Sequence, residues 1–147
     1  MPDDLLDTNI ILRIVQPQAP THILAVEAVA SILNNGDNVF LTPQILIEFW
    51  AVATRPIDVN GLGWSVTLVE TEIQQLRHQF PMLNDRPTVF SNWLQLVNQH
   101  SVQGKKVHDA RLVGVMQTYG VTHLLTFNGD DFRRYPAIVA RHPSQVI

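Results

Sequence analysis

The chain has 147 residues, of which 46% are hydrophobic, enough for one folded domain with its own core, and this excludes a disordered chain. With 13 acidic and 10 basic residues, the formal net charge is -3. This excludes a strongly basic protein that coats nucleic acid, but it does not exclude a local basic patch. We therefore expect a single domain over 1–147.

Short apolar runs alternate along the chain with segments of helical periodicity. The runs predict strands at 5–6, 39–41, 82–83, 123–126 and 138–140. The periodic segments predict helices at 10–15, 21–33, 43–53, 66–79, 88–100 and 108–119. Strands that alternate with helices indicate an α/β domain with a parallel sheet. In such sheets, ligands bind beyond the carboxyl ends of the strands.

The composition excludes several kinds of site and compartment. The chain has no cysteine, which excludes disulfides, a thiol nucleophile and metal sites built on thiolates. Its start, Met1-Pro2-Asp3-Asp4, is acidic and is not typical of a secretory signal. Since no stretch approaches the ~18 apolar residues of a membrane span, we expect a soluble, cytoplasmic protein.

Acidic residues fall where the predicted strands end or the predicted helices begin. Asp7 follows the first strand, Glu48 lies inside the apolar third helix, and Asp109 starts the sixth helix. Asp130 and Asp131 come shortly after the strand 123–126. In a parallel sheet, all of these side chains can face the same edge.

Most of these acids also have a purely structural interpretation. Asp7 can cap the helix that follows it, and Asp131 can cap a short turn. Glu48 can belong to a narrow solvent-facing stripe with Gln44 and Arg55, which share one helix face.

Asp109 is harder to explain in this way. It can favour the positive end of its helix. However, its helical neighbours are Leu112, Val113 and Met116, which puts it on the apolar side. An ionised carboxylate on a buried side needs a partner or a metal ion.

Together, these motifs resemble those of the PIN domain, and most closely the ribonuclease toxins of the VapC type in bacterial toxin–antitoxin systems. The resemblance covers nearly the whole chain. It depends on the segments Asp7-Thr8-Asn9, Glu48, His108-Asp109-Ala110 and Thr126-Phe127-Asn128-Gly129-Asp130-Asp131-Phe132.

The resemblance implies a three-layer α/β/α sandwich around a short parallel sheet, and cleavage of RNA by a carboxylate cluster that binds Mg²⁺ or Mn²⁺. Asp7, Glu48 and Asp109 match the core acids of the family. Some members have an aspartate where this chain has Asn128, so either Asp131 or Asn128 completes the set, and we take Asp131. The remaining supporting polar positions are Asn9 and Thr126.

The expected chemistry agrees with these residue types. Hard divalent cations prefer oxygen ligands, and Mg²⁺ usually binds one or two carboxylates and keeps several waters. A bound cation lowers the pKa of water and offsets charge on a phosphodiester. We expect water to attack phosphorus directly, without a covalent enzyme intermediate.

Basic and aromatic residues flank the proposed acids. Residues that can hold RNA phosphates are Lys105, Lys106, Arg111, Arg133 and Arg134. Tyr135 can stack on a base, and His108 can move a proton or contact phosphate. Trp50 and Trp93 are expected in the core, and Trp64 at a dimer or partner surface.

Two other functions compete with a ribonuclease. An aspartate after the first strand suits an aspartyl-phosphate phosphotransfer enzyme, although dehalogenase-like phosphatases have Asp-x-Asp where this chain has Asp7-Thr8-Asn9. A non-catalytic domain that binds RNA or protein is the other alternative. The resemblance further implies an antitoxin partner and a homodimer, for which the segments 21–33 and 64–79 offer apolar positions.

Overall fold

A computed structural model describes residues 3–147, so Met1 and Pro2 of the acidic start lie outside the described residues. Within that range the strands are β1 (Asp4–Leu6), β2 (Val39–Phe40), β3 (His123–Leu125) and β4 (Val139–Arg141). The α-helices are α1 (Thr8–Ile14), α2 (His22–Asn34), α3 (Pro43–Thr54), α4 (Val66–Gln79), α5 (Pro87–Gln99) and α6 (Lys106–Tyr119). Three short 3₁₀ helices follow α3, β3 and β4, namely η1 (Ile57–Val59), η2 (Gly129–Phe132) and η3 (Pro143–Gln145).

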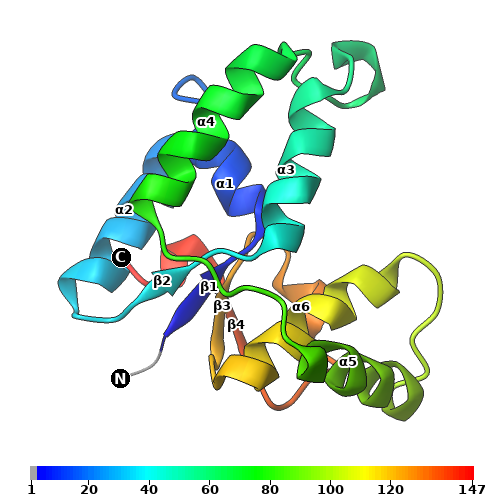
Figure 1. The fold of residues 1–147 in the computed structure, drawn as a ribbon. Coiled ribbons are helices and arrows are strands. Elements are labelled where there is room, and N and C mark those ends of the chain that lie inside the picture. Colours follow the sequence, from blue (N-terminus) through cyan, green and yellow to red (C-terminus); the bar gives the residue numbers. More distant parts are fainter. Residues whose placement is uncertain (1–2) are drawn as a thin grey trace.

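The four described strands form one parallel sheet in the order β2-β1-β3-β4. Parallel strands require crossover connections, and helices supply them here. Helices α1 to α4 gather on one side of the sheet, and α5 and α6 pack against each other on the other side (Figure 1). The expected α/β/α arrangement around a short parallel sheet is therefore confirmed.

The central strands of this short sheet are buried on both faces. Leu5, Leu6, Leu124 and Leu125 have no exposed surface, as expected for parallel strands that helices cover. Because β1 and β3 end at paired residues, the residues that follow them lie together at the carboxyl edge of the sheet.

Local capping explains where several helices begin. Thr42 accepts a hydrogen bond from the Ile45 amide at 3.1 Å and Pro43 takes the first helical position, so α3 begins as expected. Ser65 caps α4 in the same way through the Leu68 amide at 3.1 Å. Asp7 caps α1, which therefore starts at Thr8, two residues earlier than predicted.

The strand predicted at 82–83 is wrong. Met82 makes a single parallel bridge to Leu41 and is not part of a strand. The Leu41 amide donates to the Pro81 carbonyl at 3.0 Å, and the Leu83 amide donates to the Leu41 carbonyl at 2.8 Å. The chain then turns away toward α5, so the pairing does not extend.

The three tryptophans are half-buried and pack against the core. This agrees with the core positions expected for Trp50 and Trp93. Trp64, expected at a dimer or partner surface, also packs partly on the core. No helix in residues 3–147 is both long and apolar enough to cross a membrane.

Candidate active site

The carboxyl ends of β1 and β3 bring Asp7 and Thr126 together. The strands pair Leu6 with Leu125, and the Asp7 amide donates to the Leu125 carbonyl at 3.0 Å. The Thr126 hydroxyl then donates to Asp7 Oδ2 at 2.8 Å. Asp7 Oδ1 accepts from the Thr8 amide at 2.8 Å, so the same carboxylate caps α1 and faces Thr126.

The asparagines predicted to support the site lie around this contact. The Asn9 amide nitrogen donates to Thr126 Oγ1 at 3.2 Å and to Asp7 Oδ2 at 3.4 Å. Its oxygen accepts from the Phe127 amide at 3.1 Å. Asn128 reaches Thr126 through its backbone, whose amide donates to Oγ1 at 3.0 Å. The loop after β3 is thus fixed to the start of α1.

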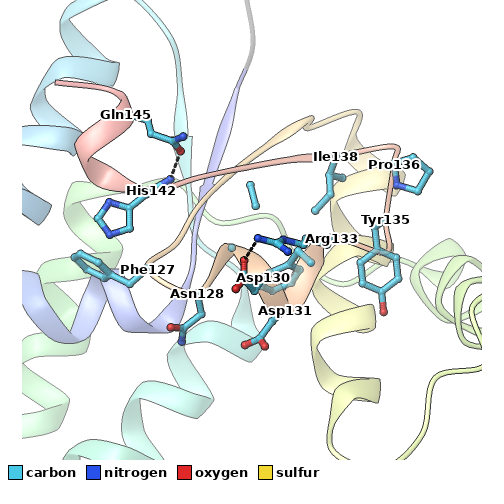
Figure 2. Close-up of a pocket in the computed structure, with 13 residues that line it drawn as sticks. Phe127, Asn128, Asp130, Asp131, Arg133, Tyr135, Pro136, Ile138, His142 and Gln145 are labelled. Carbon is cyan, nitrogen blue, oxygen red and sulfur yellow. Dashed lines mark hydrogen bonds and ion pairs between the residues drawn. The ribbon is translucent and has the colours of Figure 1, made fainter.

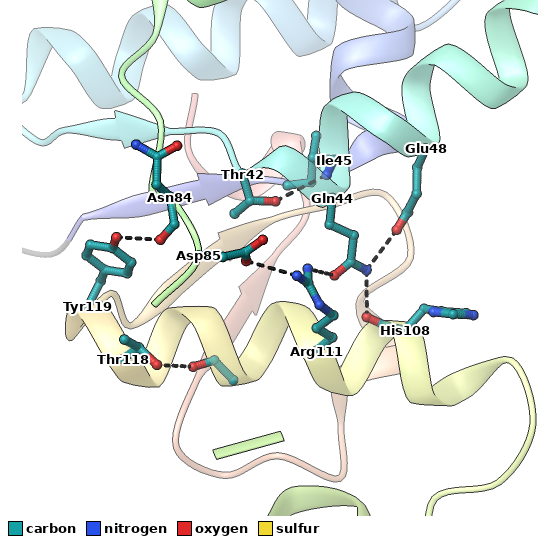
Figure 3. Close-up of polar contacts among 11 residues, drawn as sticks. Thr42, Gln44, Ile45, Glu48, Asn84, Asp85, His108, Arg111, Thr118 and Tyr119 are labelled. Atoms are coloured by element: carbon teal, nitrogen blue, oxygen red, sulfur yellow. Dashed lines mark hydrogen bonds and ion pairs between the residues drawn. The ribbon is translucent and has the colours of Figure 1, made fainter. Parts of the chain in front are cut away.

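Glu48 is held between two neighbours on the other side of Asp7. The Thr8 hydroxyl donates to Glu48 Oε2 at 3.3 Å, and the Gln44 amide donates to Oε1 at 2.9 Å. Gln44 also donates to the His108 carbonyl at 2.8 Å, which ties α3 to α6 (Figure 3). Gln44 is buried, so Gln44, Glu48 and Arg55 do not form a solvent-facing stripe.

The acidic side chains influence one another electrostatically. The pKa of Asp7 is raised to about 6, mainly by burial. The hydrogen bonds from Thr126 and Thr8 oppose this rise, and the nearby charges of Glu48 and Asp109 add to it. Burial also raises the pKa of Asp109, with added repulsion from Asp131 and Glu48. Four carboxylates from distant parts of the chain therefore share one neighbourhood.

Asp131 already has a cationic partner. Its Oδ1 is 2.7 Å from the Lys106 Nζ, and both side chains are partly exposed. Asn128 and Asp131 project to the same side of the loop after β3 (Figure 2). The charge of Asp131 acts on Asp109, but the geometry selects neither Asp131 nor Asn128 as the fourth ligand.

The five basic residues expected to bind phosphate differ in their surroundings. Arg111 donates to Gln44 Oε1 at 2.8 Å and to Asp85 Oδ1 at 2.9 Å. Arg133 forms an exposed pair with Asp130 at 2.7 Å, and Lys106 pairs with Asp131. The remaining two, Lys105 and Arg134, have exposed side chains.

Tyr135 does not offer the stacking surface that the sequence predicted. The residue is only 2% exposed, and its ring meets His100 edge-on with the ring centres 5.1 Å apart. A ring that packs into the structure in this way cannot also stack on an RNA base.

Two hollows border the acidic neighbourhood. An open groove of about 780 Å³ lies between α3 and α6, and its polar lining includes Thr8, Gln44, Glu48, Lys105, Asp109 and Arg111. A second hollow of about 830 Å³ lies beside the loop after β3 and is lined by Asn128, Asp130, Asp131, Arg133 and His142 (Figure 2). Glu48 and Asp109 therefore border the first hollow, and Asp130 and Asp131 border the second.

The donor set suits a hard divalent cation. Within residues 3–147, no three His, Asp or Glu side chains converge closely enough to hold one ion directly. Mg²⁺ does not need such convergence, because it usually binds one or two carboxylates and keeps several waters. The neighbouring negative charges raise the pKa values of Asp7 and Asp109, and a bound cation would offset this repulsion.

Comparison with known proteins identifies the family. The PIN domain model matches residues 5–138. The chain belongs to the PIN domain family. No curated protein sequence matches this PIN domain.

Solved structures share the fold of this PIN domain at low sequence identity. VapBC-1 from nontypeable Haemophilus influenzae has a TM-score of 0.72 at 17% identity, over 96% of this chain and 98% of that one. VapC20 from Mycobacterium tuberculosis, described as a sarcin–ricin loop cleaving toxin, has a TM-score of 0.67 at 14% identity, over 90% and 95%. A toxin–antitoxin complex from Klebsiella pneumoniae has a TM-score of 0.65 at 17% identity, over 93% and 96%.

The sequence analysis gave no site role to two residues beside the PIN domain acids. It placed Gln44 on the same helix face as Glu48, four positions away, but as part of a solvent-facing stripe. Asp85 carried no sequence signal, since it lies in the loop before α5, remote in sequence from the Arg111 that it contacts.

Proposed function

We propose that this PIN domain is a metal-dependent endoribonuclease that cleaves single-stranded or loop RNA. The observation that carries the proposal is the buried Asp7 carboxylate, held by Thr126 and Thr8, with the charges of Glu48 and Asp109 close by. PIN domains typically are nucleases and generally use divalent metals, and the similar VapC20 is described as cleaving an RNA loop.

The chain's own residues define the roles in this proposal. Asp7, Glu48 and Asp109 would hold Mg²⁺ or Mn²⁺, with one or two of them bound directly and the rest through the ion's waters, and Asp131 or the Asn128 side chain would complete the set. Bound there, the ion lowers the pKa of a water and offsets phosphate charge. Asn9 and Thr126 fix Asp7, and the exposed cations Lys105 and Arg134 attract the RNA backbone.

Cleavage of RNA with and without Mg²⁺ tests the proposal. We expect Asp7→Asn and Asp109→Asn each to lower the cleavage rate by at least about 100-fold. Changing a residue that supports a metal ligand typically costs about 10–100-fold in activity, and changing the ligand itself should cost no less. Asp58→Asn, an exposed aspartate in η1, is the matched control and keeps wild-type activity. Unchanged cleavage by both site variants contradicts the assignment.

Further assays separate the competing functions. Direct attack by water incorporates one labelled solvent oxygen into the product phosphate and leaves no enzyme adduct. Trapping of phospho-Asp7 during phosphomonoester hydrolysis supports the phosphotransfer alternative instead. Metal-independent RNA binding without turnover supports a non-catalytic binding domain.

We further propose that the protein is a toxin with a cognate antitoxin and that it forms a homodimer. The Klebsiella pneumoniae structure of the same fold is a toxin–antitoxin complex, which supports the first part. Exposed apolar side chains on α2 and α4, including Ile23, Val26, Val66 and Leu68, support the second. Growth arrest on expression with rescue by a co-encoded partner tests toxicity, and sedimentation at micromolar concentration tests dimerisation.

A further inference from the structure

A chain of side-chain contacts runs from the loop before α5 to Glu48. Asp85 Oδ1 accepts from Arg111 Nη2 at 2.9 Å, and Arg111 Nη1 donates to Gln44 Oε1 at 2.8 Å. The Gln44 Nε2 then donates to Glu48 Oε1 at 2.9 Å (Figure 3). The contacts join α3, α6 and the loop before α5 beside the groove.

The contacts of Gln44 allow its amide a single orientation. The oxygen faces the Arg111 guanidinium, which is a pure donor, while the nitrogen faces two acceptors, Glu48 Oε1 and the His108 carbonyl. Rotating the amide by half a turn would place its oxygen against Glu48 Oε1 and the His108 carbonyl oxygen. Its nitrogen would then face the Arg111 guanidinium. All three hydrogen bonds would then be lost at a buried position.

Glu48 depends on this amide for its own orientation. The other oxygen of Glu48 has a longer contact, 3.3 Å from the Thr8 hydroxyl. The Glu48 side chain is only half-buried and borders the open groove, so packing alone does not fix it. A flexible carboxylate beside a groove is otherwise free to sample several rotamers.

We propose that Gln44 is a positioning residue of the nuclease site, which holds the Glu48 carboxylate toward the groove, and that Arg111 acts through Gln44 by fixing its amide. This inference rests on the proposed function, because it assumes that Glu48 helps to bind the divalent ion. It assigns Arg111 to the organisation of the site in place of the phosphate contact expected from the sequence.

Binding of Mn²⁺, followed by electron paramagnetic resonance on the intact protein, tests the role directly. We expect Gln44→Met to weaken Mn²⁺ binding about 10–100-fold, as is typical when a partner that orients a metal ligand is removed. Arg111→Met leaves Gln44 in place but frees its amide, so it weakens binding in the same direction. The KM for RNA stays near the wild-type value, because the proposal assigns neither side chain a contact with the substrate.

Gln74→Met is the matched control. Gln74 donates to Glu70 at 2.9 Å on the exposed face of α4, so this variant removes the same kind of amide–carboxylate contact away from the site. Wild-type Mn²⁺ affinity in Gln74→Met and reduced affinity in Gln44→Met, with both variants folded by circular dichroism, supports the proposal. Equal affinity in the two variants overturns it.

A double variant separates positioning from other roles of Arg111. If Arg111 acts through Gln44, adding Arg111→Met to Gln44→Met changes Mn²⁺ affinity little further. If Arg111 binds RNA phosphate, the addition instead raises the KM for RNA in a salt-dependent manner, which overturns its assigned role. Wild-type protein that neither binds Mn²⁺ nor cleaves RNA refutes the proposed function. Normal wild-type behaviour with an unaffected Gln44→Met refutes this inference alone.

Discussion

Asp7 is a carboxylate whose surroundings favour the protonated form. Burial raises its pKa from an ordinary value of 3.8 to about 6 in the folded chain. Between these two values the folded state binds more protons than the unfolded state, so stability falls as the pH rises. The contribution of Asp7 to the free energy of unfolding is fully present below about pH 4 and is lost as the pH rises past about 6. The loss amounts to about 3 kcal/mol.

Thermal unfolding in EDTA between pH 4 and pH 7.5 measures this effect. We expect the Tm of the wild type to fall over that range, and the fall to be smaller in Asp7→Asn, which cannot titrate. Asp109 and Asp4 also have raised pKa values, so part of the slope remains in the variant. Identical slopes for the two proteins would contradict the assigned pKa of Asp7.

Asp131 is predicted to matter less for cleavage than Asp7. Its side chain is 39% exposed and already paired with Lys106, so losing its charge disturbs a solvated contact. We expect Asp131→Asn to lower kcat/KM about 10-fold, at the low end of the range for a group that supports a metal site. Asp130→Asn changes an exposed neighbour paired with Arg133 and serves as the control. An Asp131→Asn variant as inactive as Asp7→Asn would place Asp131 among the core acids.

At the scale of elements, the packing of α5 on α6 depends on Gly114. A Cβ added there would lie 3.3 Å from the Trp93 amide nitrogen and 3.3 Å from the Val89 carbonyl oxygen. Both are backbone atoms of α5, so the helix as a whole must move. We expect Gly114→Ala to lower the free energy of unfolding by about 1 kcal/mol, because overpacking outweighs the gain in helix propensity. Urea denaturation measures it.

Gly129→Ala is the control for that experiment. Its added Cβ would meet the Ala140 side chain at an ordinary 3.8 Å. Stability should therefore stay the same or rise slightly, since alanine restricts the unfolded chain. Equal destabilisation by the two substitutions would show that the close approach of α5 to α6 is not what Gly114 provides.

The sequence predicts element type well where a local signal marks the ends. Helix α4 matches its prediction at both ends, because Ser65 provides a cap and the periodicity stops at Gln79. Helix α6 begins two residues before its prediction. Lys105 provides no side-chain cap there, and a glycine followed by two lysines is typical of a loop. Tertiary packing determines where a helix such as α6 begins, and the local sequence carries no signal for it.

The same reasoning explains which parts of the candidate site were predictable. The contact between Asp7 and Thr126 follows from two apolar strands that end side by side in a parallel sheet. Contacts such as Arg111 with Asp85 or Lys106 with Asp131 join helices to loops through long side chains. Their formation depends on how the helices pack, and no periodicity in the sequence encodes it.

At the scale of the whole molecule, one ion pair joins the first and last strands. Arg141 in β4 donates to both oxygens of Asp4 in β1 at 2.8 Å, across the intervening strand β3. Asp4 has no exposed surface, and burial raises its pKa despite the guanidinium. Among residues 3–147, the Arg141 Nε is one of the few buried polar atoms without a hydrogen-bond partner. The pair therefore joins β1 to β4 at a cost in desolvation.

Breaking this pair should cost more than replacing it. Arg141→Met leaves a buried carboxyl without its partner, and we expect the free energy of unfolding at pH 7 to fall by about 3 kcal/mol. The double variant Asp4→Leu with Arg141→Met removes both charges and should recover most of that loss. Two apolar side chains leave no charge buried without a partner. Arg133→Met, which breaks the exposed pair with Asp130, should change urea denaturation very little. A double variant no more stable than Arg141→Met would show that the contact from Arg141 Nη2 to the carboxylate itself stabilises the fold, and not only the avoidance of a lone buried charge.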